Sequence, residues 1–185
     1  HRLKHELDLP LVATFHTLDR VKAEAGVGDD PETRARIEGE IVSCADLMIA
    51  ATDEERGQLV TLYGAEGDRI EVVPPGVDHR VFVPGDRGAA RRELGLDSEA
   101  QVLLYVGRIQ PLKAPDILIR AAERFVAADP SLRDRLVVAI VGGPSGNGLE
   151  HPECPAELAR RLGVDDITRF VKPVQQDVLA DWYRA

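Results

Sequence analysis

The chain has 185 residues, of which 44% are hydrophobic and 30% are charged, and its formal net charge is -9. This length suits one large domain or parts of two, and the balance of apolar and charged residues excludes a disordered chain. An acidic protein lacks the excess of lysine and arginine that neutralises phosphates, so nucleic acid is not an expected partner. Any anionic ligand has to be held by a local group of basic side chains.

Targeting and redox signals are sparse. No apolar run approaches the roughly 20 residues of a membrane-spanning helix, and no signal peptide opens the chain, so we expect a cytoplasmic protein. Cys44 and Cys154 match no metal-binding pattern, and reduced thiols are expected. The chain opens on His1 and a helical pattern still runs at Ala185, so we expect both ends to be cut from a longer protein.

Short apolar runs alternate with helical patterns along the chain. We expect strands at 10–15, 47–51, 69–73, 102–106, 136–141 and 168–171, and helices at 31–45, after Thr52, at 89–94, 115–128, 155–162 and from 177 onward. Strands that are apolar throughout are buried on both faces, so this alternation predicts parallel sheets covered by helices. Residues 77–86 show no periodicity and read as a connector, which divides the chain into the parts 1–78 and 79–185.

Two loops follow apolar strands at the edge where open parallel sheets bind ligands. In the loop 107–113, Arg108 and Lys113 are suited to a diphosphate; the alternative is two solvated surface charges, and the placement between strand and helix favours the ligand. The loop 142–148 has glycines that leave backbone N–H groups free to face a ligand, but it is neither a Walker loop nor Gly-x-Gly-x-x-Gly. A flexible loop explains it equally well.

The first half offers weaker signals. His16 and Thr17 follow a strand, and a histidine there is a sugar partner, a catalytic base or a satisfied polar residue, of which the last is favoured on pattern alone. Arg34 and Arg36 lie four residues before Glu38 and Glu40, a spacing typical of surface ion pairs on a helix.

Taken together, these segments resemble glycosyltransferase family 4, the retaining enzymes of the GT-B fold. The resemblance runs over most of the chain and is carried by residues 15–18, 72–78, 82–85, 106–113, 141–146 and 169–185. It implies an α/β fold with two Rossmann-like domains and parallel sheets, both truncated here. Residues 1–78 would be the C-terminal part of an acceptor-side domain, and 79–185 the N-terminal part of the nucleotide-sugar donor domain.

Within the family, the pattern is most similar to the subgroup that acts in actinobacterial mycothiol biosynthesis. Such enzymes transfer N-acetylglucosamine from UDP-N-acetylglucosamine to 1D-myo-inositol 3-phosphate, so a nucleotide sugar and a small phosphorylated acceptor are the implied partners. A sucrose-phosphate-synthase-like or lipid-linked acceptor stays open, as do a non-catalytic nucleotide-binding module and a homodimer. An NAD-type oxidoreductase is disfavoured, because no Gly-x-Gly-x-x-Gly follows a strand.

On the donor side, the resemblance implies that Arg108 and Lys113 bind the UDP diphosphate and that Val174 contacts the uracil through its backbone. It also places a magnesium ion near Tyr183 and Arg184. The mechanism of the fold requires no cofactor besides the UDP-sugar co-substrate, and we expect no enzymatic nucleophile.

On the acceptor side, the resemblance assigns Thr17 to the acceptor phosphate and places His16 beside the transferred sugar as a candidate catalytic residue. Arg34 or Arg36 would grip the same phosphate, and the spacing to Glu38 favours Arg34.

The chain departs from the family pattern in one residue and lacks two segments. Ala114 replaces the usual glycine, and we expect tolerance unless that position needs a positive φ. The family's glycine loop lies before His1 and its Glu-x7-Glu segment lies after Ala185. The chain alone is therefore expected to be inactive.

Overall fold

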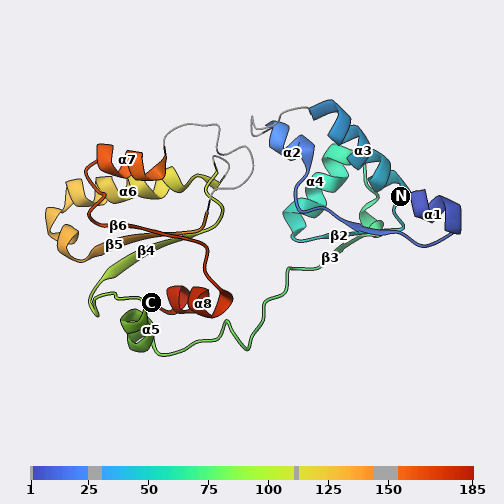
Figure 1. Cartoon of the computed structure of the whole chain (residues 1–185). Coiled ribbons are helices and arrows are strands. Elements are labelled where there is room, and N and C mark those ends of the chain that lie inside the picture. Colours follow the sequence, from blue (N-terminus) through green and yellow to red (C-terminus); the bar gives the residue numbers. More distant parts are fainter. Residues whose placement is uncertain (1, 25–30, 111–112, 144–153) are drawn as a thin grey trace. The chain divides into compact units, whose positions relative to one another are not determined.

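The computed structural model describes residues 2–24, 31–110, 113–143 and 154–185 (Figure 1). The chain divides into two compact units, His1–Val77 and Asp78–Ala185. Each unit contains one sheet of three parallel strands with helices packed against it. Among the described residues, no helix has the length and apolar character needed to cross a membrane.

The first unit has the strand order β1-β2-β3. Its strands are β1 (Val12–Thr14), β2 (Leu47–Ala50) and β3 (Ile70–Val72), and its helices are α1 (Arg2–Leu7), α2 (Asp19–Glu24), α3 (Pro31–Cys44), α4 (Asp53–Tyr63) and a 3-10 turn at Gly67–Arg69. The central strand pairs on both sides, with Met48 opposite both Ala13 and Ile70. Met48, Leu59 and Ile70 are buried in the core of this unit.

Helix α4 shows how the sequence sets local structure. The hydroxyl of Thr52 accepts a hydrogen bond from the Glu55 backbone amide at 3.1 Å, as its N-cap position predicts. The Glu55 carboxylate in turn accepts from the backbone amide of Ala51 at 2.6 Å. The helix ends at Gly64, which has a φ of 68°.

The second unit has the strand order β4-β5-β6. Its strands are β4 (Gln101–Val106), β5 (Leu136–Val141) and β6 (Thr168–Val171), and its helices are α5 (Arg87–Glu93), α6 (Pro115–Ala128), α7 (Pro155–Arg161), α8 (Gln176–Arg184) and a 3-10 turn at Pro130–Asp134. Figure 1 shows α6 and α7 on one face of this sheet and α5 and α8 on the other.

The central strand β5 is apolar throughout because both of its faces are covered. Val138 and Ile140 pack with Leu158 of α7, while Ala139 and Val141 pack in a separate cluster with Trp182. Alternate residues of one strand therefore enter two cores, which confirms the interpretation of the continuous apolar run.

The expected strands and helices are found, with small shifts at their ends. The first strand is shorter than expected, Val12–Thr14, and the expected helix at 89–94 begins earlier, at Arg87, where Asp86 caps it through the Ala89 amide at 3.0 Å. Sequence analysis missed α1 and α2, which have six residues each. Helices this short do not repeat an apolar position often enough to show a period.

Candidate functional site

The C-terminal edge of the second sheet is held together by backbone hydrogen bonds. The amide of Gly107, just after β4, donates to Val141 O at 3.0 Å, and the amide of Ile109 donates to Gly143 O at 2.9 Å. The Tyr105 hydroxyl donates to Arg108 O at 2.8 Å. The start of the expected diphosphate loop is thus fixed against the end of β5.

The glycines at this edge are needed for close approach. A Cβ atom on Gly142, whose φ is 154°, would lie 1.9 Å from the carbonyl oxygen of Gly107. A Cβ on Gly143 would lie 3.0 Å from Cγ of Pro173, which follows β6. The loops after all three strands therefore meet here. The rest of the expected glycine loop, 144–148, lies outside the described residues.

Arg108 and Lys113 both have exposed side chains. Within the described ranges, neither forms a salt bridge, whereas Arg133 of the same unit pairs with Asp166 at 2.8 Å. Their charges are not neutralised by a described carboxylate and are available to an anion. The convergence of the two side chains on one diphosphate stays a prediction.

Two further donor-side residues have informative surroundings. Ala114, directly before α6, has a φ of 46° and a ψ of 51°, so the position that carries glycine in the family pattern does adopt a left-handed conformation. Val174 is half-buried and packs against the core cluster that contains Val141 and Trp182. Its side chain is used in packing, which leaves its backbone for the expected uracil contact, a role that stays a prediction.

The Arg184 side chain, which the resemblance places near a magnesium ion, cannot be a ligand of that ion. Arg184 donates through Nε to Val83 O at 3.0 Å and through Nη2 to Val81 O at 2.7 Å, and its Nη1 pairs with Asp181 at 2.8 Å. A guanidinium has no acceptor atom and cannot ligate a cation. Tyr183 is 59% exposed. In the part of the chain that the structure describes, no three His, Cys, Asp or Glu side chains are placed to hold a metal ion, and the magnesium ion near Tyr183 and Arg184 stays a prediction.

In the first unit, the structure joins two of the predicted acceptor residues. Arg34 of α3 donates through Nη2 to Thr17 O at 2.8 Å and to Thr17 Oγ1 at 3.0 Å. Its Nε donates to Glu38 Oε1 at 2.7 Å. Arg36 instead pairs with Glu40 on the exposed side of the same helix. The contact with Thr17 therefore distinguishes Arg34 from Arg36.

His16 is exposed, and no hydrogen bond joins it to a described residue. Within the described ranges, His16 thus lacks the hydrogen-bond partner that its interpretation as a satisfied polar residue requires. Its place beside a transferred sugar stays a prediction.

Glu38 is the centre of a buried polar network that sequence analysis missed. Its Oε2 accepts from the backbone amide of Asp19 at 2.9 Å and from the hydroxyl of Tyr63. Burial alone would raise the pKa of Glu38, but the hydrogen bonds from Tyr63, Asp19 and Arg34 outweigh it and lower that pKa below 4.5. Burial, with the neighbouring Glu38, raises the pKa of Tyr63 to about 12.

The face of α3 that carries Glu38 was readable from the sequence. Ala35, Glu38 and Val42 follow one another at helical spacing, and all three are buried. We interpreted Glu38 as a surface partner because four-residue spacing fits either face of a helix. The flanking apolar residues carried the information that it points inward.

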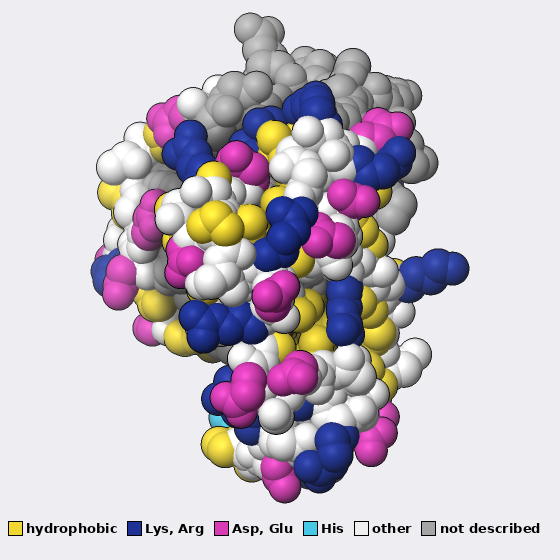
Figure 2. Space-filling model, turned by 90° about the vertical axis from the view of Figure 1, so that its left-hand side faces the viewer, with side chains coloured by type: hydrophobic (Ala, Val, Ile, Leu, Met, Phe, Trp, Pro, Cys, Tyr) yellow, Lys and Arg dark blue, Asp and Glu magenta, His cyan; other side chains and the backbone are white. Residues whose placement is uncertain are grey.

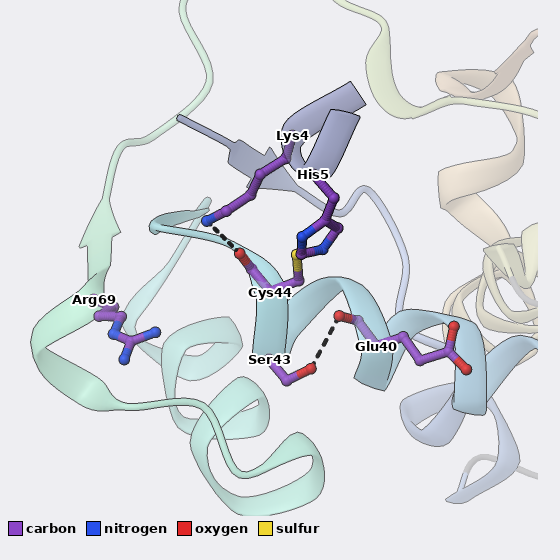
Figure 3. A pocket seen from close by; sticks show the side chains of 6 residues that line it. All are labelled: Lys4, His5, Glu40, Ser43, Cys44 and Arg69. Atoms are coloured by element: carbon purple, nitrogen blue, oxygen red, sulfur yellow. Dashed lines mark hydrogen bonds between the residues drawn. The ribbon is translucent and has the colours of Figure 1, made fainter. Parts of the chain in front are cut away.

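A separate open cavity of about 550 Å³ lies in the first unit, lined by Lys4, His5, Glu40, Ser43, Cys44 and Arg69 (Figure 3). Cys44 precedes β2 and Arg69 precedes β3, so the cavity lies at the N-terminal edge of the sheet. Lys4 is already paired with Asp46 at 2.6 Å. Ligands of open parallel sheets bind at the opposite, C-terminal edge, so this cavity is not part of the candidate site.

The surface charge is mixed. Figure 2 shows basic and acidic side chains interspersed over one face of the molecule, with no broad area of a single sign. Anion binding therefore depends on a few placed cations, as the net charge of -9 indicates.

Comparisons with known proteins match both units. A family model described as Glycosyltransferase Family 4 matches residues 1–81, and one described as Glycosyl transferases group 1 matches residues 86–185. A D-inositol 3-phosphate glycosyltransferase from Kribbella flavida is 62% identical over 180 residues, which cover 96% of this chain and 42% of that relative. The chain thus spans less than half the length of this curated relative.

Solved structures agree on the fold. Sucrose-phosphate synthase from Thermosynechococcus elongatus matches with a TM-score of 0.80 at 24% identity, over 99% of this chain and 44% of that one. An Anabaena protein solved with UDP and glucose matches with a TM-score of 0.76 at 19% identity, over 96% and 46% of the two chains. The expected fold class, an α/β GT-B fold with parallel sheets, is confirmed.

Proposed function

The chain belongs to the glycosyl transferases group 1 family, and we propose that the full-length protein transfers N-acetylglucosamine from UDP-N-acetylglucosamine to 1D-myo-inositol 3-phosphate with retention. The observation that carries this proposal is the 62% identity with the Kribbella flavida D-inositol 3-phosphate glycosyltransferase over 96% of the chain. The contact between Thr17 and Arg34 supports a phosphorylated acceptor, because it joins a hydroxyl and a guanidinium at one exposed position.

In the proposed reaction, the bond between the sugar and UDP breaks as the acceptor hydroxyl attacks the same face of the sugar, and the hydroxyl proton passes to an oxygen of the departing diphosphate. Arg108 and Lys113 stabilise the negative charge that develops on the departing diphosphate. The loop that carries Arg108 is fixed by the Tyr105 hydroxyl and by the close approach of Gly142 to Gly107. These contacts fix the backbone that carries Arg108, which reduces the reorganisation needed during the reaction. The proposed mechanism requires neither an enzymatic nucleophile nor a cofactor besides the UDP-sugar co-substrate.

The donor assignment is tested by calorimetry of UDP binding to the full-length protein. Replacing Arg108 or Lys113 with alanine should weaken binding by about 1.5–3 kcal/mol, the scale of a hydrogen bond to a charged group. Arg124 is an exposed arginine on α6, and Arg124→Ala is the matched control, expected to leave UDP affinity unchanged. Equal affinities for all variants and the wild type would reject the donor site.

The acceptor assignment is tested by product analysis. The wild-type full-length protein, given UDP-N-acetylglucosamine, should glycosylate 1D-myo-inositol 3-phosphate and leave unphosphorylated myo-inositol unmodified. Transfer to fructose 6-phosphate or to a lipid-linked acceptor, with none to inositol phosphate, would replace the proposed acceptor. Binding of UDP-sugar with no transfer to any acceptor would favour a non-catalytic module.

A further inference from the structure

The acceptor-side arginine is held by a partner that lies beneath the surface. The Glu38 side chain is 5% exposed, while the Arg34 side chain that it binds is 45% exposed. The ion pair therefore runs from the interior of the first unit to its surface. The pair of Arg36 and Glu40 does not connect the interior to the surface, because both of its side chains contact solvent.

Three elements fix the Glu38 carboxylate. Oε2 accepts from the Asp19 amide at the start of α2 and from the Tyr63 hydroxyl at the end of α4, which leaves Oε1 for Arg34 on α3. A carboxylate with both oxygens occupied cannot rotate without breaking a hydrogen bond, and its position is set by the packing of α2, α3 and α4.

The Arg34 guanidinium is held on two of its three nitrogens. Nε is bound by Glu38, and Nη2 is bound by the carbonyl and hydroxyl oxygens of Thr17. No hydrogen bond joins Nη1 to a described residue, so its two N–H groups are left for a ligand. The Thr17 hydroxyl accepts from Arg34 and so keeps its own proton to donate. Three donors thus remain at one place, which suits the oxygens of a phosphate monoester.

From this arrangement we infer that Glu38 is a positioning residue of the acceptor site, acting through Arg34 on the phosphate of the acceptor. The inference rests on the proposed function and extends it to a residue that does not touch the substrate. Glu38 fixes the plane of the guanidinium, and Tyr63 fixes Glu38. Because the arginine is already held in place, binding of the phosphate does not have to offset the entropy cost of ordering a long side chain.

When the Glu38 charge is lost, the Arg34 guanidinium can pair with a second carboxylate, that of Asp19. Asp19 Oδ1 lies 3.9 Å from Arg34 Nε, and Asp19 Oδ2 is buried with no hydrogen-bond partner among the described residues. Without Glu38, the guanidinium is attracted to Asp19 and turns away from its contacts with Thr17. The consequence is a misplaced cation in a folded protein, which differs from a general loss of structure.

The test uses the full-length enzyme and separates the two substrates. Glu38→Gln keeps the side-chain volume and removes the charge, and it should raise the KM for the phosphorylated acceptor about tenfold or more, since a hydrogen bond to a charged group is misdirected. The KM for UDP-N-acetylglucosamine should stay within about twofold, because the donor residues belong to the second unit. Glu40→Gln is the matched control: it removes the same charge from the same helix, and both KM values should stay at the wild-type level.

A double variant separates positioning from structure. In an Arg34→Ala background, Glu38→Gln should raise the acceptor KM no further, because Glu38 acts only through Arg34. Tyr63→Phe is the milder variant, to be used where Glu38→Gln does not fold, and it should raise the acceptor KM several-fold with the donor KM unchanged. Equal effects of Glu38→Gln and Glu40→Gln, parallel rises in both KM values, or an undiminished effect in the Arg34→Ala background would each overturn the inference.

The wild-type measurement comes first and judges the proposed function separately. If the wild type transfers to a different phosphorylated acceptor, the proposed acceptor is wrong, and the same variants are then assayed on that acceptor. If a transferred acceptor carries no phosphate and Glu38→Gln leaves its KM unchanged, the positioning role is wrong as well.

Discussion

Ala114 carries a backbone conformation that suits glycine better than any other residue. Its φ of 46° places Cβ close to the following carbonyl, and the residue stands immediately before Pro115, the first residue of α6. Left-handed geometry costs an L-residue roughly 1–2 kcal/mol. The sequence showed the departure from the family pattern, and we expected tolerance unless φ was positive. The structure meets that condition, so the alanine is strained.

Ala114→Gly should therefore raise the free energy of unfolding by about 0.5–1 kcal/mol, since relief of strain exceeds the extra entropy of glycine in the unfolded chain. The measurement is urea or thermal unfolding of the full-length protein. Ala121→Gly, within the same helix α6, is the control and should lower stability by about 1 kcal/mol. Destabilisation by both substitutions would show that the strain at Ala114 is negligible.

Gly142 is required for a different reason, which is steric. Gly142→Ala brings a methyl carbon to within 1.9 Å of the Gly107 carbonyl oxygen, so the loop after β4 has to move. We expect lower stability and weaker UDP binding, since Arg108 moves with that loop. Gly95 has a φ of 60° with no atom near its absent Cβ, so Gly95→Ala should cost only stability. Calorimetry with UDP distinguishes the two variants. Unchanged UDP affinity in Gly142→Ala would show that Gly142 does not contribute to the donor site.

At the scale of helices and strands, the elements with a strong sequence pattern were predicted, and those with a weak pattern were not. The strands β2, β4 and β5 were predicted because each contains an uninterrupted apolar run; in β5 this run follows from burial on both faces, whereas β2 fully buries only alternate residues. The helices α1 and α2 were not predicted, because six residues are too few to show a helical period. For α3, the helix was expected, but the inward direction of Glu38 was not, because its four-residue spacing from Arg34 fits either face of a helix, and only its neighbours Ala35 and Val42 mark the buried face.

The network around Glu38 makes the free energy of unfolding depend on pH in the acid range. The folded-state pKa of Glu38 lies below 4.5, because three donors favour its charged form over the cost of burial. A lowered pKa means that the unfolded chain binds the proton more tightly, so this contribution to stability is present above pH 4.5 and is lost as the pH falls through the folded pKa.

Glu38→Gln should therefore reduce the slope of unfolding free energy against pH in the acid range below about 4.5. The measurement is denaturant unfolding of the full-length protein at several pH values, for the variant and the wild type. Parallel acid slopes, with the variant merely less stable at every pH, would show that the charge of Glu38 is not what the network stabilises.

For the molecule as a whole, the sequence predicted the fold class and left the site partly open. Parallel α/β architecture follows from periodicity, and the GT-B class followed from the resemblance. The pairing of Thr17 with Arg34 joins the bend before α2 to a residue of α3, 17 positions later in the sequence, and no spacing rule predicts such a contact. Residues 144–148, the end of the glycine loop, lie outside the described residues, and the roles of His16 and Val174 stay predictions.

The two units should respond to core substitutions independently, because each hydrophobic cluster lies within one unit. Ile140 of β5 and Leu59 of α4 are both fully buried, and truncation of such residues to alanine costs about 2–5 kcal/mol. In hydrogen exchange of the full-length protein, Ile140→Ala should reduce amide protection in β5 and α6 while β2 and α4 keep theirs, and Leu59→Ala should do the reverse. A drop in protection across both units after either substitution would mean that they unfold as one cooperative body, and that the connector at 77–86 does not separate two domains.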